Sequence, residues 1–181
     1  MSQINEGEPR VVAIYTAIAA GEPIELTNQI MAIAGKGLEG DRYAFGQGSF
    51  NRSKTAKGFI AAIIQLVKGW FKRRMKRQVT FISSEAFKGT GFTYSQSRRN
   101  IVVKNIELMW LIGRTFRIGK AIFYGVKYCD PCNRPTKLIG KDETVESFKK
   151  IFFDRGGLIA EVIKGGLIKE GDLIIIQPKG Y

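Results

Sequence analysis

The stretch "RRNIVVKNIELMWLIGRTFRIGKAIFYGVKYC", residues 98–129, divides into short apolar runs. Glycines at 113, 119 and 125 separate these runs. Short runs rich in β-branched and aromatic residues, bounded by glycine, are typical of strands joined by tight turns. The stretch therefore predicts several short β-strands in succession.

Segments on both sides of this stretch have the same character. "RVVAIYTAIA" (10–19) and "EPIELTNQIMAIAG" (22–35) read as strands, and "GGLIAEVIKGGLIKEGDLIIIQP" (156–178) reads as strand, turn and strand. "KDETVESFKKIFFDR" (141–155) has the apolar spacing of a helix. We therefore expect a mainly β fold with small α additions, arranged as a β-barrel, with residues 1–181 forming a single domain.

One segment departs from this pattern. "KGFIAAIIQLVKGWFKRRMKR" (57–77) places its apolar residues on one half of a helical wheel and ends in a basic cluster. We expect an inserted amphipathic helix. Its apolar half would pack on the barrel or a second subunit, lie on an anionic membrane surface, or form a lid over a cofactor site. Its uncharged core is far too short to span a bilayer.

The charge of the chain limits the classes of function. The formal net charge is +13, and no acidic residue lies between Asp41 and Glu85. Such a surface favours partners that carry phosphate. The chain contains no histidine, which excludes histidine acid–base catalysis and histidine metal ligation within it. No flavin or nicotinamide GxGxxG motif and no signal peptide is recognisable, so we expect a cytoplasmic protein.

Both cysteines lie in "YCDPCNRP" (128–135). Cys129 and Cys132 supply only two of the four ligands that a structural zinc site needs, so an intrachain zinc site is disfavoured. The pair alone leaves open a buried structural role, dithiol redox chemistry, and a thiolate that holds a soft metal or carries sulfur. Pro131 and Pro135 would stiffen this loop.

Five motifs in a fixed order make the chain resemble a known family, the MOSC domain, named for the C-terminal domain of molybdenum-cofactor sulfurases. The motifs are "GKGLEGDRYAFG", "RQVTFISSEAF", "RRNIVVKNIEL", "LIGRTFRIGKAIFYGVKYCDPCNR" and "RGGLIAEVIKGGLIKEGDLI". The resemblance implies a β-barrel that binds a molybdopterin-type molybdenum cofactor or carries sulfur for it. Pyridoxal phosphate binding is not expected.

The resemblance also marks site residues. The family's cysteine corresponds to Cys132, which is a molybdenum ligand in relatives that reduce N-hydroxylated compounds and would bear a persulfide in a sulfur carrier. Cys129 receives no role. The other implied cofactor-binding residues are Gly40, Asp41, Arg42, Arg99 and Asn100. Of these, Arg42 and Arg99 would contact the cofactor phosphate, and the amide of Asn100 would read a pterin edge.

Two departures from the family pattern stand out. Tyr43 occupies a place where relatives often have histidine, and the insert over residues 52–76 is much longer than the short link expected there. We also expect this chain to lack the N-terminal barrel domain of the amidoxime reducers. Three functions therefore stay in view. A reductase would take electrons from a partner protein, and a sulfur carrier would take sulfur from a cysteine desulfurase. A nucleic-acid-binding barrel is disfavoured because the aromatics fall in apolar strands and in the insert.

Overall fold

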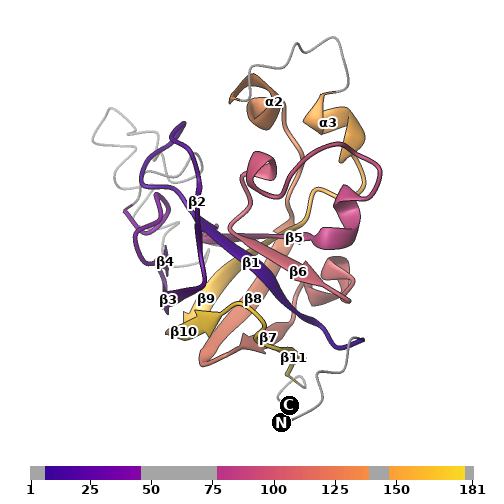
Figure 1. Ribbon diagram of the computed structural model, residues 1–181. Helices are drawn as coiled ribbons and strands as arrows, with labels where there is room; N and C mark the ends of the chain where they lie inside the picture. Colours follow the sequence, from indigo (N-terminus) through magenta and orange to yellow (C-terminus); the bar gives the residue numbers. More distant parts are fainter. Residues whose placement is uncertain (1–6, 46–76, 139–146, 178–181) are drawn as a thin grey trace, which may run out of the picture.

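A computed structural model describes residues 7–45, 77–138 and 147–177. These residues form two sheets (Figure 1). The larger sheet has eight strands in the order β11 (Ile174–Ile176), β7 (Thr115–Ile118), β8 (Ala121–Tyr128), β9 (Leu158–Lys164), β5 (Val79–Ser83), β6 (Ile101–Lys104), β1 (Arg10–Thr16) and β2 (Glu25–Thr27). The smaller sheet has the order β10 (Gly166–Lys169), β3 (Gln29–Ile33) and β4 (Gly37–Leu38).

The helical elements are short. They are α2 (Arg134–Leu138), α3 (Phe148–Ile151) and the 3-10 turns η1 (Ser84–Phe87), η2 (Ser95–Ser97) and η3 (Leu108–Leu111). In Figure 1, α2 and α3 lie at the opposite end of the molecule from β7 and β11. The predicted mainly β fold with small α additions is confirmed. In the described part of the chain, no helix has the length and apolarity needed to cross a membrane.

The expected closed barrel differs from the observed sheet. Within the described residues, the strand ladders run from β11 to β2 without joining these two ends. The start of β1 reaches the β11 side through one bridge between Arg10 and Leu173 and through a 2.9 Å hydrogen bond from Ile174 N to Pro9 O. β2 and β11 have only three residues each, and each pairs with one neighbour, β1 and β7 respectively.

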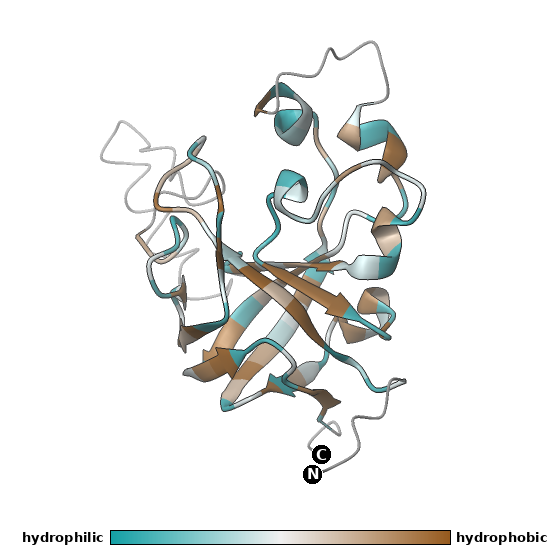
Figure 2. Cartoon of the chain, in the orientation of Figure 1, coloured by the Kyte–Doolittle hydropathy of each residue, from teal (hydrophilic) through white to brown (hydrophobic). Residues whose placement is uncertain are grey.

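The main core lies on one face of the large sheet, and a second buried cluster that includes Ile82, Val102 and Phe152 lies on the other face. Phe81, Phe116 and Phe123 are fully buried, and their ring centroids lie 5.5–5.6 Å apart. Figure 2 shows that the crossing strands are mostly hydrophobic. Thr80 precedes Phe81 in β5, and Cα pairing places it opposite Ile159 of β9. Because successive side chains on a strand alternate between faces, Thr80 and Ile159 lie on the face away from this aromatic core.

The predicted amphipathic helix over residues 57–77 lies outside the described residues, except for Arg77. Its packing, membrane and lid alternatives therefore remain predictions. The described chain resumes at Arg77, and the next residue, Gln78, is hydrogen-bonded to β9. Gln78 N donates to Ala160 O at 3.2 Å, and Gln78 Oε1 accepts from Val162 N at 2.9 Å. These bonds fix the backbone that carries Arg77.

Candidate functional site

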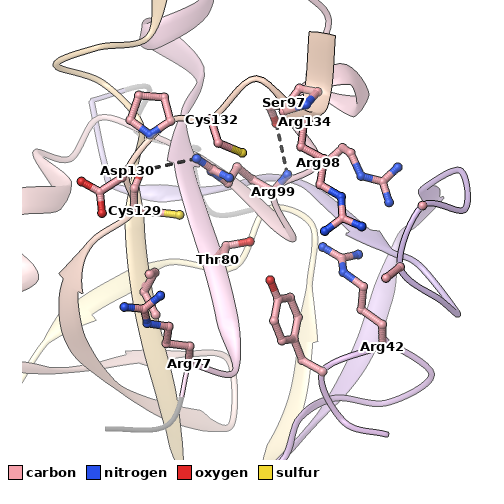
Figure 3. Close-up of a pocket in the computed structure, with 16 residues that line it drawn as sticks. Arg42, Arg77, Thr80, Ser97, Arg98, Arg99, Cys129, Asp130, Cys132 and Arg134 are labelled. Atoms are coloured by element: carbon pink, nitrogen blue, oxygen red, sulfur yellow. Dashed lines mark hydrogen bonds between the residues drawn. The ribbon is translucent and has the colours of Figure 1, made fainter. Parts of the chain in front are cut away.

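A pocket of about 310 Å³ lies over the face of β5 and β9 that carries Thr80 and Ile159 (Figure 3). Its wall comes from segments far apart in the sequence: residues 20–21, 42–43, 77–80, 97–99, 129–135 and Ile159. Its lining residues are Ala20, Gly21, Arg42, Tyr43, Arg77, Thr80, Ser97, Arg98, Arg99, Cys129, Asp130, Pro131, Cys132, Arg134, Pro135 and Ile159. A cavity of this size can take a small molecule.

The two thiols line this pocket but differ in accessibility. Both cysteines are free; Cys129 is buried and Cys132 is exposed. Burial is the main cause that raises the pKa of the Cys129 thiol, so Cys129 is protonated at neutral pH. Cys132 is therefore the thiol of this pair that a reagent, metal or sulfur donor can reach.

The loop that carries both thiols is held from one side by Tyr128 and Arg99. The Tyr128 hydroxyl donates to Phe153 O at 2.6 Å and accepts from Gly156 N at 2.9 Å. Arg99 Nε donates to Gly156 O at 2.9 Å, and its Nη2 donates to Cys129 O at 3.4 Å. A Cβ on Gly156 would lie 2.3 Å from Cys129 O, so only glycine permits this close approach. The loop is thus fixed by packing and by hydrogen bonds.

Five arginines line the pocket, against one acidic lining residue, Asp130. The Asp130 carboxylate lies 3.7 Å from Lys127 Nζ. Arg98 has a left-handed backbone with φ of 58°. Burial, and then the charges of Arg42 and Arg134, lower the pKa of Arg98. Mutual repulsion among three guanidinium groups is the property expected of a binding site for an anion.

Arg42 and Arg99 add to this positive charge in different ways. The Arg42 side chain is buried, and its Nη1 has no hydrogen-bond acceptor among the described residues. That Nη1 lies 3.6 Å from Asp41 Oδ1, beyond hydrogen-bond distance. Arg99 is also buried, and no carboxylate pairs with it in the described ranges. Arg42 therefore offers an unused donor although Asp41 partly balances its charge, and Arg99 brings a charge that no described carboxylate balances.

Asp41 and Asn100 lie behind this wall. Asp41 is fully buried and accepts from Ala17 N, from Tyr43 N and from Asn100 Nδ2, at 3.0, 3.0 and 3.1 Å. Asn100 Oδ1 accepts from both Thr80 N and Thr80 Oγ1, while Nδ2 donates to Tyr15 O and to Asp41. All four hydrogen-bonding positions of the Asn100 amide are thus used within the protein.

The residues predicted from the sequence therefore divide into three groups. Arg42, Arg99 and Cys132 line one pocket, although 57 and 33 residues separate them in the chain. Asp41 and Asn100 support the pocket wall without lining it. Gly40 is exposed, has a φ of 73° and lies outside the lining. Its backbone conformation allows the turn that carries the next two residues.

Arg77, Arg134 and Tyr43 also line the pocket, and the sequence motifs predicted no ligand-binding role for them. Arg77 belongs to the basic run at the end of the insert, and Arg134 follows the cysteine pair, so both were visible only as charge. Tyr43 stood out only as a replacement for histidine. Burial is the main cause that raises the pKa of its hydroxyl. Which of the 29 lysines and arginines meet in one pocket depends on the tertiary fold.

The donors in the described part of the chain do not form a complete metal site. Within the described ranges, no group of three or more histidine, cysteine, aspartate or glutamate residues could hold a metal ion. A metal at Cys132 would therefore have one thiolate ligand from this chain. The remaining ligands would have to arrive with the metal as part of a larger group.

Comparison with known proteins agrees with this architecture. The crystal structure of YuaD from Bacillus subtilis superimposes with a TM-score of 0.67 at 18% identity, covering 93% of this chain and 95% of that one. YiiM from Geobacillus stearothermophilus has a TM-score of 0.58 at 12% identity, covering 95% and 76%. YiiM from Escherichia coli has a TM-score of 0.58 at 13% identity, covering 94% and 71%.

Sequence similarity identifies the family of the chain. A search of curated proteins found no significant match. The sequence profile of the MOSC domain matches residues 69–175, which include β5 through β11 and the thiol loop. This match covers more than half of the chain and contains most of the pocket wall. The chain belongs to the MOSC domain family.

Proposed function

We propose that this protein binds a molybdenum cofactor of the molybdopterin type in the arginine-lined pocket, with Cys132 as the protein ligand of the metal. The family is associated with this cofactor. The observation that carries the proposal is the pairing of one exposed thiol with five arginines in one cavity. A soft metal centre suits the thiol, and a phosphate suits the arginines.

The residues present fit such a group. Arg42, Arg98 and Arg134 would hold its phosphate, because their charges act on one another and Arg42 Nη1 lacks a hydrogen-bond acceptor within the described part of the chain. A molybdopterin-type cofactor brings its own sulfur ligands, so one thiolate from the chain is enough. When bound, the cofactor would supply electron transfer to the N–O bond of an N-hydroxylated substrate, with electrons from a partner protein.

The chain's own residues would prepare the site. Arg99 and Tyr128 hold the thiol loop in place through the bonds to Gly156, Cys129 and Phe153. Burial keeps Cys129 protonated, so it does not compete with Cys132 as a ligand. We assign Asp41 and Asn100 a positioning role. Their hydrogen bonds hold the segments that carry Arg42 and Arg99 against β5.

A sulfur carrier is the second candidate. Cys132 is exposed and free, which is what a sulfur donor such as a cysteine desulfurase would need in order to reach it. In this function Cys132 would carry a persulfide for the maturation of a metal–sulfur cofactor. A nucleic-acid-binding function has less support, because five arginines gather inside one pocket instead of along an open aromatic surface.

Native mass spectrometry of protein purified anaerobically from cells that make the cofactor would separate the two candidates. Bound molybdenum and pterin, released on denaturation, support the proposed function. A covalent gain of one sulfur atom at Cys132, removed by a reducing agent, supports the sulfur carrier. Protein from the same cells with neither group would contradict both.

A further inference from the structure

A second hollow adjoins the arginine-lined pocket, and we call it the side hollow. Its volume is about 270 Å³. Two residues, Gly21 and Arg98, line both the side hollow and the arginine-lined pocket, whereas Cys132 lines only the pocket. Because the two spaces meet at Arg98, a ligand whose phosphate lies on Arg98 would have room to extend away from the thiol.

Packing and backbone bonds hold the walls of the two spaces together. Arg42 N donates to Ala17 O at 2.7 Å, which ties Arg42 to the segment that continues to Ile24 in the side hollow. On the other wall, α2 packs against η2. Arg98 follows η2 directly, and its N donates to Ser95 O at 3.1 Å. The arginines and the walls of the side hollow therefore keep a defined relative position.

The shared edge of the two spaces is built for an anion. Figure 3 shows the side chains of Arg42, Arg98 and Arg134 directed toward one another at one side of the pocket. The Arg42 side chain is only 8% exposed, and its Nη1 has no acceptor in the described part of the chain. A bound phosphate oxygen would satisfy this buried donor and offset the three charges.

The lining of the side hollow is of a different kind. Pro23, Ile24 and Leu138 give it apolar groups, and Leu138 is 42% exposed. Gln96 adds a polar group from η2; its Oε1 accepts from Thr93 N at 2.9 Å, so its Nε2 is left to donate. A nucleobase has apolar faces and a hydrogen-bonding edge, which match this combination of apolar and polar groups.

We propose that the two spaces form one site for a nucleotide, with phosphate groups on Arg42, Arg98 and Arg134 and the attached nucleoside in the side hollow. This inference rests on the proposed function and extends it. The pterin would lie between Cys132 and the arginines, and the cofactor phosphate would be joined to a nucleoside monophosphate. Neither space alone much exceeds about 300 Å³, the lower limit usual for small-molecule sites, so a ligand of this size needs both.

Isothermal titration calorimetry of cofactor-free protein tests this inference. The full chain would be purified from cells that cannot make the cofactor. It would be titrated, at constant ionic strength and without divalent cations, with pyrophosphate and with the diphosphates of adenosine, guanosine, cytidine and uridine. The measured quantity is the ratio of the Kd of pyrophosphate to the Kd of the tightest nucleotide. Burial of about 60 Å² of apolar base surface predicts a ratio of about ten. A ratio near one for all four nucleotides would overturn the inference.

Four variants make the result specific. Ile24→Ala and Leu138→Ala remove apolar groups from the side hollow, and each should lower the ratio about threefold while the Kd of pyrophosphate stays unchanged. Leu26→Ala removes a similar, exposed group that lines neither space, and it should keep the wild-type ratio. Arg98→Gln should weaken pyrophosphate and nucleotide binding by the same factor. A ratio that neither Ile24→Ala nor Leu138→Ala lowers would overturn the placement of the nucleoside.

Mass spectrometry of the released pterin separates failure of this inference from failure of the proposed function. The protein would be purified from cells that make the cofactor both with and without a nucleotide. A pterin that carries a nucleoside monophosphate supports both proposals. Bound molybdenum with a pterin that ends in its own phosphate would overturn the inference and leave the proposed function intact. Protein with neither molybdenum nor pterin would contradict the proposed function, and the calorimetric ratio would still decide whether the nucleotide site exists.

Discussion

Asn100 Nδ2 donates a 3.1 Å hydrogen bond to Asp41 Oδ1, and both residues are almost completely buried. The bond joins the turn before Arg42 to the turn after Arg99. Because each of these turns contributes an arginine to the pocket wall, the Asn100–Asp41 bond sets the relative position of two parts of the site. Asp41 and Asn100 thus act on the pocket from behind it.

Asp41→Ala tests this role. The substitution would leave Ala17 N, Tyr43 N and one of the two N–H groups of Asn100 Nδ2 without an acceptor, while the other N–H still donates to Tyr15 O. We expect the free energy of unfolding to fall by about 3–5 kcal/mol, measured by urea denaturation. Asp130→Ala, which removes an exposed carboxylate, should change it by less than about 0.5 kcal/mol. Equal effects from the two variants would contradict the structural role of Asp41.

Gly156→Ala tests the packing behind the thiol loop. The new methyl group would meet Cys129 O at 2.3 Å, with Pro131 and the Tyr128 hydroxyl each at 2.8 Å. Overpacking of this kind should lower the free energy of unfolding by about 1–3 kcal/mol. Gly7→Ala is the matched control, because no atom lies within 4 Å of its added Cβ. A Gly156→Ala protein as stable as the Gly7→Ala protein would show that the loop is free to move.

The Cys129 thiol should make stability depend on pH. Burial raises its pKa above the value of 9.0 expected in the unfolded chain. The unfolded state therefore loses this proton first as pH rises, and stability present below pH 9 is lost above it. The expected slope approaches about 1.4 kcal/mol per pH unit. Urea denaturation between pH 8 and pH 10 should reveal the slope in the wild type.

Cys129→Ser provides the comparison for this pH dependence. Serine does not titrate in this range, so the variant should lose the part of the slope that begins near pH 9. The pKa values of Tyr15, Tyr43 and Tyr128 are raised above 10.0, so by the same linkage these groups add to the slope as the pH approaches 10, equally in the wild type and in Cys129→Ser. A slope that persists unchanged in Cys129→Ser would mean that another group is responsible.

Arg98 should couple stability to phosphate. Inorganic phosphate at about ten times its Kd should stabilise the folded protein by about 1.4 kcal/mol. Arg98→Gln should lose most of this gain, and it should be no less stable than the wild type without phosphate, because repulsion from Arg42 and Arg134 is relieved. Thermal denaturation at constant ionic strength measures both effects. Lys36→Gln, which removes an exposed charge, should keep the full gain from phosphate.

Much of the fold could be predicted from the sequence, because glycine-bounded apolar runs are a local signal. The strands around residues 98–129 formed as expected. The open end of the sheet was not predictable in this way, because it depends on which strands the end strands β2 and β11 pair with. A barrel and an open sheet share the same local pattern.

The site was harder to predict for a related reason. A polar side chain in a motif can face a ligand or support the residues that do, and only tertiary contacts distinguish these roles. Asn100 was expected to read a pterin edge, yet its amide is fully engaged with Thr80, Tyr15 and Asp41. Arg77 precedes β5 and Arg134 follows β8, yet both line the pocket. No local sequence pattern reveals that these two residues meet.

The molybdenum content of two cysteine variants tests the central claim most directly. Wild type, Cys132→Ser and Cys129→Ser would be purified from the same cofactor-producing cells, and molybdenum per protein would be measured by mass spectrometry of the metal. We predict close to one molybdenum in the wild type and in Cys129→Ser, and almost none in Cys132→Ser with its fold intact by circular dichroism. Equal molybdenum in the two variants would contradict the assignment of Cys132 as the metal ligand.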